Sequence, residues 1–249
     1  MSVLSIGTTH PWNVAGVGLD LRIGAELGMR VFTVVCAVSA QDARRVHALE
    51  ALALPTIDAQ LQTIPWERVR AVRIGALAMP GTAALLASAL ARKSVPIVVD
   101  PVFAASGGGA LGGESTLRAI GDTLGSMAQT ILTPNLAEAS ALLRREVGRE
   151  DLVRAATELK GRGARAVLLK GGHLAGDPAD VLADDDGVET FSGGRIDGGM
   201  RGTGCTLAMA LASALARGAA LRDAVHFARA FVREKIAHAV QVDGMRAAY

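Results

Sequence analysis

The stretch Gly202-Thr203-Gly204-Cys205-Thr206, which runs on into Leu207-Ala208-Met209-Ala210-Leu211, decides how the rest of the chain is interpreted. Its two glycines allow a tight turn and a close approach of the backbone to a ligand. Helix-forming residues continue to Arg217, and Gly218 then provides a typical helix end. Because the first N–H groups of a helix lack partners and carry the positive end of the dipole, this stretch predicts an anion site before helix 206–217.

Cys205 lies at the predicted start of this helix. The dipole and the free N–H groups are expected to lower the pKa of a thiol there, which would make Cys205 reactive. The alternative is a small apolar residue buried under a helix that begins after a glycine turn. Both interpretations stay open from this stretch alone.

Composition excludes several classes of protein. The 249 residues are 50% hydrophobic but only 3% aromatic, so the core must be built from Ala, Val, Leu and Ile. A net charge of +2, with acidic and basic residues interspersed, argues against nucleic acid or an anionic membrane as a partner. Two cysteines without a CxxC motif and five scattered histidines indicate neither a disulfide framework nor a zinc site.

The compartment is predicted from the N-terminal residues and the apolar runs. Residues 1–11 have neither the basic region nor the long apolar region of a signal peptide. Apolar runs such as residues 31–38 are far too short to span a membrane. We therefore expect a cytoplasmic protein without a membrane partner.

Apolar periodicity predicts strands and helices that alternate along the chain. The predicted strands are residues 3–6, 30–38, 71–74, 96–99, 130–132 and 166–169. The predicted helices are residues 15–27, 43–54, 82–91, a helix from about 115, and 136–143, 151–160, 206–217 and 221–240. Residues 57–69 are predicted to hold a short strand and a helix, and Pro55 is expected to end the helix before them.

This alternation predicts the fold class. Two further strands, 180–183 and 188–191, should form a hairpin because Asp186-Gly187 tolerates positive φ. Alternating strands and helices imply a three-layer α/β fold, in which a mainly parallel central sheet has helices on both faces. No linker or repeat divides the chain, so we expect one domain over residues 1–249.

Polar residues follow three of the predicted strands, at the edge where such sheets bind ligands. They are Asp100-Pro101, Thr133-Pro134-Asn135 and Lys170-Gly171-Gly172-His173. Lys170 either offers a compact charge to phosphate oxygens or only terminates the sheet edge. Asn135 and Glu138 either form a helix capping box or hold Mg²⁺ through water and phosphate.

Two polar residues near the N-terminus also indicate a ligand. Asp20 lies within an apolar helical face, where a charge is rarely buried unless it is paired or bound. Gln41 ends the second predicted strand and could make paired hydrogen bonds to a heterocycle.

A glycine-rich segment resembles a dinucleotide fingerprint only in its letters. Residues 107–112 match GxGxxG, but seven residues separate them from Val99 and no acidic residue follows at the required distance. The chain also has no GxxxxGK[ST] phosphate loop. Residues 107–112 are therefore expected to form a loop or flap.

Taken together and in order, these motifs resemble the hydroxymethylpyrimidine/phosphomethylpyrimidine kinases of thiamin biosynthesis, which belong to the ribokinase-like superfamily. The resemblance runs from about residue 3 to residue 240. It is carried by Asp100-Pro101-Val102, the Thr-Pro-Asn-Leu-Ala-Glu run 133–138, Lys170-Gly171-Gly172-His173 and Gly202-Thr203-Gly204-Cys205-Thr206. Cysteine at position 205 is the most specific feature, because most of the superfamily has aspartate there.

The resemblance implies a ribokinase-like phosphotransferase that uses ATP and Mg²⁺. The acceptor would be the hydroxymethyl group of 4-amino-5-hydroxymethyl-2-methylpyrimidine or its phosphate. The transferred group would lie in an anion cradle formed by Gly202, Thr203 and Gly204. Cys205 would accept or orient the hydroxymethyl proton as a general base.

The resemblance also assigns the binding residues. The nucleotide phosphates would be bound by Lys170, Asn135, Glu138 and Thr206, with Mg²⁺ held by Asn135 and Glu138 through water. The acceptor site would contain Thr8, Gly16, Asp20, Gln41 and Ala76. The partner is therefore a small molecule, and a homodimer is expected.

Departures from the family pattern cluster near the acceptor. The opening loop reads Trp12-Asn13-Val14-Ala15-Gly16 in place of Ser-Gly-Gly-Ala-Gly, Ala76 replaces a methionine, and Arg201 replaces a histidine. The alternatives are a pyridoxal- or pyridoxine-type kinase and a non-catalytic binding protein for a thiamin precursor. The joint presence of the phosphate-side residues, Cys205, Asn135, Glu138 and Lys170, argues against the binding protein.

Overall fold

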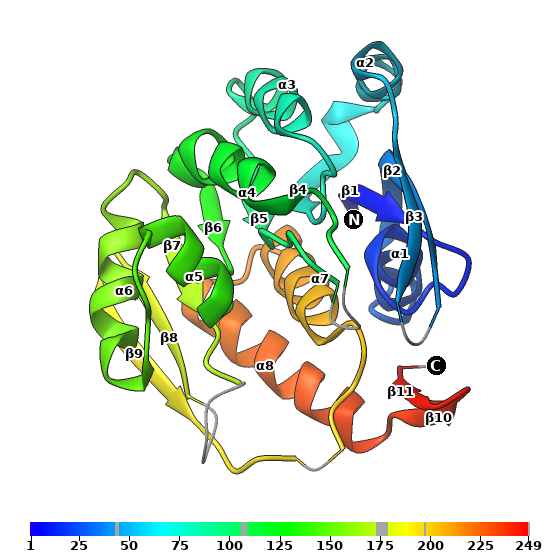
Figure 1. Ribbon diagram of the computed structural model, residues 1–249. Coiled ribbons are helices and arrows are strands. Elements are labelled where there is room, and N and C mark those ends of the chain that lie inside the picture. Colours follow the sequence, from blue (N-terminus) through cyan, green and yellow to red (C-terminus); the bar gives the residue numbers. More distant parts are fainter. Residues whose placement is uncertain (43–44, 106–108, 173–178, 197, 249) are drawn as a thin grey trace.

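The chain folds around a nine-stranded sheet (Figure 1). The computed structural model describes residues 1–42, 45–105, 109–172, 179–196 and 198–248. The strands are β1 (Ser2–Thr9), β2 (Arg30–Gln41), β3 (Val46–Ala51), β4 (Val69–Ile74), β5 (Ile97–Val99), β6 (Thr130–Leu132), β7 (Ala166–Leu169), β8 (Ala179–Asp184) and β9 (Gly187–Ser192). Their order is β3-β2-β1-β4-β5-β6-β7-β8-β9. The strands from β2 to β7 pair in parallel, whereas β3 at one edge and β8 and β9 at the other are antiparallel.

Helices cover both faces of this sheet (Figure 1). One face carries α1 (Gly16–Glu26), α7 (Thr203–Ala216) and α8 (Leu221–Ala237). The other carries α2 (Leu54–Gln62), α3 (Pro80–Leu90), α4 (Gly113–Asp122), α5 (Leu136–Leu143) and α6 (Leu152–Lys160). The predicted three-layer, mainly parallel α/β fold is confirmed.

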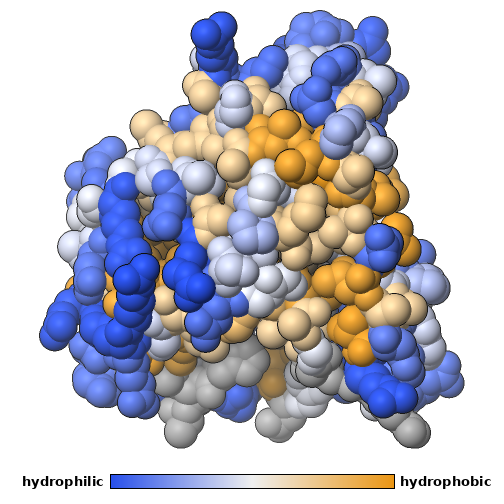
Figure 2. Space-filling view, turned by 45° about the horizontal axis from the view of Figure 1, so that its top comes forward, coloured by the Kyte–Doolittle hydropathy of each residue, from blue (hydrophilic) through white to orange (hydrophobic). Residues whose placement is uncertain are grey.

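Hydrophobic side chains gather on one part of the surface (Figure 2). They occupy the middle and right of the face shown, on the half of the molecule that carries β3, whereas the left flank is mostly hydrophilic. Val38, Ala40 and Ala48 are exposed on the outer face of the β2–β3 hairpin, where Ala40 pairs with Ala48. Within the described ranges, no helix is long and apolar enough to cross a membrane.

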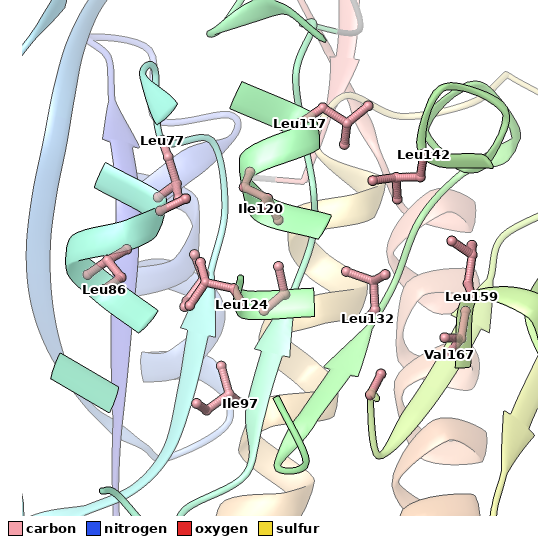
Figure 3. Packing of buried hydrophobic residues seen from close by; sticks show 14 of the residues in the cluster. Leu77, Leu86, Ile97, Leu117, Ile120, Leu124, Leu132, Leu142, Leu159 and Val167 are labelled. Atoms are coloured by element: carbon pink, nitrogen blue, oxygen red, sulfur yellow. The ribbon is translucent and has the colours of Figure 1, made fainter. Parts of the chain in front are cut away.

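The core between the sheet and α2–α6 is aliphatic, as the low aromatic content requires. Figure 3 shows Leu117 of α4 and Leu142 of α5 pointing toward one another, and these two side chains belong with Ile120 to a cluster of leucines, isoleucines and valines. Leu117 and Ile120 are fully buried. Replacing such a buried side chain with alanine typically lowers the free energy of unfolding by about 2–5 kcal/mol. The packing of this core therefore contributes strongly to keeping the strands in place.

Most predicted elements are confirmed, but the helix predicted at 43–54 is wrong. The described part of that segment is β3, which pairs with β2 from Ala37↔Ala51 to Gln41↔Val46. Pro55 does not end a helix; it lies in the first turn of α2, where its missing N–H leaves no hydrogen bond unmade. Residues 43–44 lie outside the described residues.

Two further predictions need correction. Residues 57–69 contain no strand before β4; they hold the rest of α2 and a short 3₁₀ helix, Trp66–Arg68. The helix predicted at 221–240 ends at Ala237 and is followed by a small hairpin of β10 (Val240–Val242) and β11 (Met245–Ala247). The turn between them is Asp243-Gly244, both with positive φ, which is a hairpin signal already present in the sequence.

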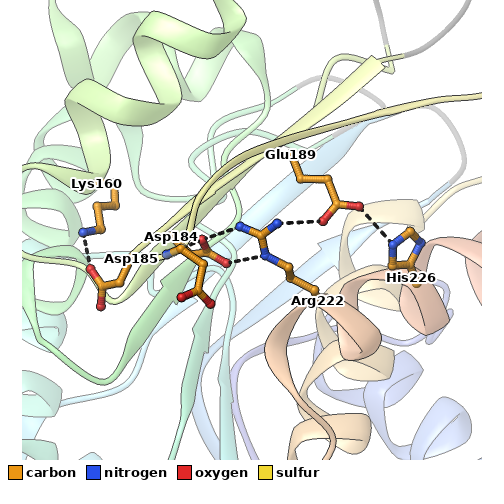
Figure 4. Close-up of polar contacts among 7 residues, drawn as sticks. Lys160, Asp184, Asp185, Glu189, Arg222 and His226 are labelled. Atoms are coloured by element: carbon orange, nitrogen blue, oxygen red, sulfur yellow. Dashed lines mark hydrogen bonds and ion pairs between the residues drawn. The ribbon is translucent and has the colours of Figure 1, made fainter.

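Ion pairs fasten the β8–β9 hairpin to α8 (Figure 4). Arg222 of α8 donates to both carboxylate oxygens of Asp184 at 3.1 and 2.8 Å, and it approaches Glu189 at 3.5 Å. His226, one turn further along α8, lies 3.0 Å from Glu189. The antiparallel pairing of β8 with β9 confirms the predicted hairpin. The ion pairs attach this hairpin to the helix layer that also contains α7.

Candidate active site

The carboxyl ends of the parallel strands border a cavity of about 430 Å³. The strand order reverses here, because β2 lies on one side of β1 and β4 on the other. Such a reversal opens a crevice in which α/β proteins bind ligands. Residues from five strand ends line the cavity, namely Thr8 and His10 at β1, Ala76 at β4, Asp100 at β5, Asn135 at β6 and Lys170 at β7.

The start of α7 forms another wall of the cavity. Gly202 caps the helix with φ 79°, and Thr203, Gly204 and Cys205 form its first turn. A Cβ atom on Gly202 would lie 2.3 Å from the carbonyl oxygen of Val14, so this position needs glycine. The first backbone bond of the helix runs from Thr206 N–H to Gly202 at 2.8 Å, and the N–H groups before it are therefore available to a ligand.

Thr206 has a different position from the one expected of a phosphate ligand. Its side chain is fully buried, and its hydroxyl donates to the Gly202 carbonyl oxygen at 2.9 Å. It is not among the residues that line the cavity. This contact stabilises the glycine turn.

The pKa of Cys205 shifts in the direction opposite to the one expected. Burial raises the pKa of the thiol, and the charges of Asp20 and Asp100 add to the increase. Arg73 and the Gly16 N–H act in the lowering direction but do not outweigh burial. The prediction from the helix dipole alone was wrong chiefly because the sulfur is buried, and because carboxylates from distant parts of the chain also act on it.

A charged pair lies beside the first turn of α7. Lys170 Nζ donates to Asp100 Oδ1 at 2.6 Å. Burial opposes protonation of Lys170, but the negative charges of Asp100 and Glu138 outweigh it and raise its pKa. A Cβ atom on Gly204 would lie 3.2 Å from Asp100 Oδ2 and 3.4 Å from Lys170 Nζ. The glycine thus lets the helix start approach the pair closely.

Asn135 and Glu138 form the capping box and also line the cavity. Glu138 N–H donates to Asn135 Oδ1 at 2.9 Å, and Asn135 N–H donates to Glu138 Oε2 at 2.7 Å. Burial raises the pKa of Glu138 to about 7, against the lowering effect of Lys170. Asn135 and Glu138 can therefore cap helix α5 and face a ligand in the cavity at the same time.

The end of the cavity near β1 and β2 contains four of the five expected acceptor residues: Thr8, Gly16, Gln41 and Ala76. Thr8 donates its hydroxyl to the Ala76 carbonyl oxygen at 3.0 Å, which joins β1 to β4. Gly16 has φ 60°, and a Cβ atom there would lie 2.2 Å from Thr8 O. Gln41 is 8% exposed, and its Oε1 has no hydrogen-bond partner among the described residues. A buried acceptor atom of this kind calls for a ligand donor.

Asp20, the fifth expected acceptor residue, does not line the cavity. It is fully buried, accepts a hydrogen bond from Ser5 at 2.6 Å, and pairs with Arg73 at 3.1 Å. Arg73, which does belong to the cavity wall, was missed by the sequence analysis. A single arginine within the strand 71–74 was the available signal, because a buried charge requires a partner.

Two other residues of the cavity were not assigned from sequence. His10 is 4% exposed, and burial lowers its pKa. Arg201 is half-buried, and its backbone N–H donates to Arg246 of β11 at 2.8 Å. Val14 of the altered opening loop packs with Met245 and Ala247 of β11. The C-terminal hairpin therefore supports both departures from the family pattern.

The glycine-rich segment borders the same cavity. Ala104 bridges to Ala110, and Leu111 N–H donates to the Phe103 carbonyl oxygen at 2.8 Å, so the chain folds back on itself before α4. Ala104, Ala105 and Leu111 line the cavity. Residues 106–108 and His173 lie outside the described residues.

Comparison with known proteins gives a consistent result. The phosphomethylpyrimidine kinase family profile matches residues 11–248. A hydroxymethylpyrimidine/phosphomethylpyrimidine kinase of Rhizobium meliloti is 36% identical over 245 residues, covering 96% of this chain and 92% of the relative.

Solved structures agree with that match. A phosphomethylpyrimidine kinase of Clostridium difficile 630 superimposes with a TM-score of 0.82 and 28% identity, covering 95% of this chain and 99% of its own. A Bacillus subtilis pyridoxal kinase solved as an ADP complex gives a TM-score of 0.88 and 26% identity, covering 100% and 97%.

Proposed function

The chain belongs to the phosphomethylpyrimidine kinase family, and we propose from this premise how its own residues transfer a phosphoryl group. It is a phosphotransferase that phosphorylates the hydroxymethyl group of a small heterocycle in thiamin biosynthesis. The acceptor that we assign is 4-amino-5-hydroxymethyl-2-methylpyrimidine or its monophosphate, and the donor is ATP.

The proximity of Gly204 to Asp100 and Lys170 carries the proposal. Phosphoryl transfer needs in-line positioning and neutralisation of charge on the transferred group. The N–H groups at the start of α7 and the Lys170 ammonium converge from two sides of one cavity, which suits a phosphoryl group between them. Gly202, Thr203 and Gly204 form the cradle in this proposal.

The reaction requires one proton to be removed from the acceptor. With the alcohol as acceptor, the hydroxymethyl oxygen forms a bond to the γ-phosphorus while the bond from that phosphorus to the β–γ bridging oxygen breaks, and ADP leaves. The hydroxyl proton passes to the Cys205 thiolate, which acts as the general base and becomes a neutral thiol. Cys205 is half-buried and lines the cavity at the helix start, where it can reach a hydroxyl beside the cradle.

Lys170, Asn135 and Glu138 bind the nucleotide phosphates in this proposal. Mg²⁺ fits the pair Asn135 and Glu138 as an ion held through water, because it keeps several waters and takes few protein ligands. One Glu138 oxygen is occupied by the capping bond, which leaves the other for a water. Among the described residues, no group of three or more His, Cys, Asp or Glu side chains could hold a metal ion. When bound, Mg²⁺ would neutralise phosphate charge.

Gln41, Gly16, Thr8 and Ala76 hold the acceptor ring. The free Gln41 Oε1 suits an exocyclic amino group, and Gly16 allows the ring to lie against the backbone. We assign Asp20 an indirect role, because it reaches the cavity only through Arg73. Thr206 acts indirectly as well, by holding the Gly202 turn.

We propose that the enzyme is a single catalytic domain that forms a homodimer in the cytoplasm. The exposed small apolar residues of the β2–β3 hairpin support the homodimer, because a second copy would cover them. Two free thiols, Cys36 and Cys205, fit a reducing compartment.

A pyridoxal-type kinase is the second candidate. Ala76 and the alanines at 15, 104 and 105 leave space at the acceptor end for a larger ring, and the Bacillus subtilis neighbour is a pyridoxal kinase. The family profile and the identity to hydroxymethylpyrimidine/phosphomethylpyrimidine kinases favour the pyrimidine.

A kinase assay over an acceptor panel tests this assignment. ADP formation is measured with the pyrimidine alcohol, its monophosphate, pyridoxine and pyridoxal, each with MgATP. We expect the highest kcat/KM for the pyrimidine alcohol or its phosphate. A higher kcat/KM for pyridoxine or pyridoxal would show that the acceptor is a pyridoxine-type alcohol and not the pyrimidine. Absence of ADP formation with every acceptor would overturn the kinase assignment.

A further inference from the structure

Arg73 is a charged side chain in the middle of the hydrophobic sheet. It lies on β4 between Val72 and Ile74, and it is fully buried. The chain makes room for it at Gly75, where a Cβ atom would lie 2.1 Å from an Arg73 terminal nitrogen. A buried charge is costly unless its partners are well arranged, so this arginine needs a reason to be present.

The guanidinium joins two carboxylates from different elements. It lies 3.1 Å from Asp20 of α1 and 3.6 Å from Asp100 beyond β5. Asp20 is also held by Ser5, and Asp100 by Lys170. The result is a row of alternating charges under the start of α7, from the acceptor end of the cavity to the nucleotide end.

The ion pairs do not satisfy all Arg73 donors. Nε and both terminal nitrogens make no hydrogen bond of normal geometry to the part of the chain that the structure describes. Arg73 also belongs to the cavity wall. In a purely structural ion pair the buried donors are usually hydrogen-bonded. Buried donors without such bonds beside a cavity are typical of a site that binds a ligand.

The sulfur of Cys205 is the remaining group next to this arginine. The two side chains interact electrostatically, and each favours the charged form of the other. The other groups that act on the thiol are Asp20 and the Gly16 N–H from α1, Asp100 beyond β5 and Lys170 beyond β7. Burial and the two carboxylates oppose the thiolate, and Arg73 is the largest influence in its favour.

We propose that Arg73 is the positioning residue of the site: it holds Asp100 beside Lys170 and sets a positive charge against the Cys205 sulfur, which favours loss of the thiol proton. The proposal rests on the proposed function, in which that sulfur takes the acceptor proton. Arg73 acts through Cys205 and Asp100 rather than by contact with the reacting atoms.

The test titrates the Cys205 thiol in the intact protein without substrates. The rate of alkylation by iodoacetamide is followed against pH for the wild type and for Arg73→Gln, with Cys205→Ala as the blank. Cys36 should contribute little, because it is fully buried and its pKa is raised to about 12. A neighbouring opposite charge typically lowers the pKa of an acidic group by about 1–3 units, so Arg73→Gln should raise the pKa of the Cys205 thiol by that amount.

Kinetics provide the second readout. In Arg73→Gln, the rising limb of kcat against pH should move to higher pH by the same amount as the thiol titration. Arg73→Lys keeps the positive charge but lacks the planar guanidinium that reaches both Asp20 and Asp100. The pH at which its kcat rises should therefore lie between those of the wild type and Arg73→Gln. A loss of structure alone would lower kcat at every pH without moving the limb.

If Arg73→Gln does not fold, a second pair of variants provides the same comparison. Asp20→Asn and Asp20→Asn/Arg73→Gln differ only in the arginine, and the double variant buries no unpaired Asp20 charge. The double variant should have the higher thiol pKa by about 1–3 units. Equal thiol pKa values in that pair, or in the wild type and Arg73→Gln, would overturn the proposal. Because alkylation needs no kinase activity, this result is independent of whether the proposed acceptor is correct.

Discussion

Replacing Glu138 separates its two roles, because glutamine and alanine remove different parts of the side chain. Glutamine can still accept the Asn135 N–H bond, which is 2.7 Å long, so Glu138→Gln keeps the capping box and removes the charge. Alanine removes both. Comparison of the two variants therefore isolates the charge from the cap.

The expected change in the free energy of unfolding follows from the pKa of Glu138. Burial raises the pKa of Glu138 from 4.5 to about 7, so the folded state holds the proton more tightly than the unfolded state. This contribution favours folding fully below pH 4.5 and is lost as the pH rises through about 7. At about 1.4 kcal/mol for each pKa unit, the loss is roughly 3 kcal/mol. Glutamine does not titrate, so Glu138→Gln should gain up to that much stability over the wild type between pH 4.5 and 7.

The assays are urea unfolding across this pH range and kcat with a Mg²⁺ titration. Glu138→Gln should lose about 10- to 100-fold in kcat or in apparent Mg²⁺ affinity, because a group that holds a metal through water is typically worth that much. Glu138→Ala should lose as much activity and, in addition, about 0.5–2 kcal/mol for the cap. Normal kcat and Mg²⁺ dependence in folded Glu138→Gln would refute the phosphate-side role and leave only the capping box.

Substitutions at three other positions test the remaining assignments. Cys205→Ala should lose about 10²- to 10⁴-fold in kcat and keep ATP binding, and Cys205→Asp should retain more activity than alanine; full turnover by Cys205→Ala in a kinase assay would exclude the general base. Gln41→Ala should weaken the pyrimidine alcohol by about 10- to 100-fold in calorimetry, from the roughly 1–3 kcal/mol of a lost buried bond, with ATP binding as the control; an equal loss for both ligands would contradict its role. Ala76→Met should narrow the acceptor end and lower kcat/KM for pyridoxine more than for the pyrimidine alcohol; equal loss for both would show that this position does not select the acceptor.

The sequence predicted the parallel part of the sheet well because local signals are strong there. Strands β6 and β7 and helix α5 have the predicted bounds, since short buried runs and the Asn135 cap leave few alternatives. The edge strand β3 was mistaken for a helix. Its backbone bonds come from β2, and its alternating exposed residues, including Ala48 and Glu50, are also good helix formers.

The candidate site shows the same division between local and long-range effects. The motif residues at the strand ends were found individually, and strand order alone brings Asp100, Asn135 and Lys170 together. The pairing of Asp20 with Arg73 joins α1 to β4, more than fifty residues apart, so no local pattern could reveal it. The helix dipole predicted the wrong direction for the pKa of Cys205 because tertiary packing buries the sulfur, which a local pattern does not show.

A crystal structure with Mg²⁺, a non-hydrolysable ATP analogue and the pyrimidine alcohol tests the central claim most directly. We expect the γ-phosphate oxygens within about 3 Å of the N–H groups that begin α7 and of Lys170 Nζ. We also expect the hydroxymethyl oxygen between the γ-phosphorus and the Cys205 sulfur. A γ-phosphate bound away from the start of α7, or a hydroxymethyl group turned away from Cys205, would contradict the claim.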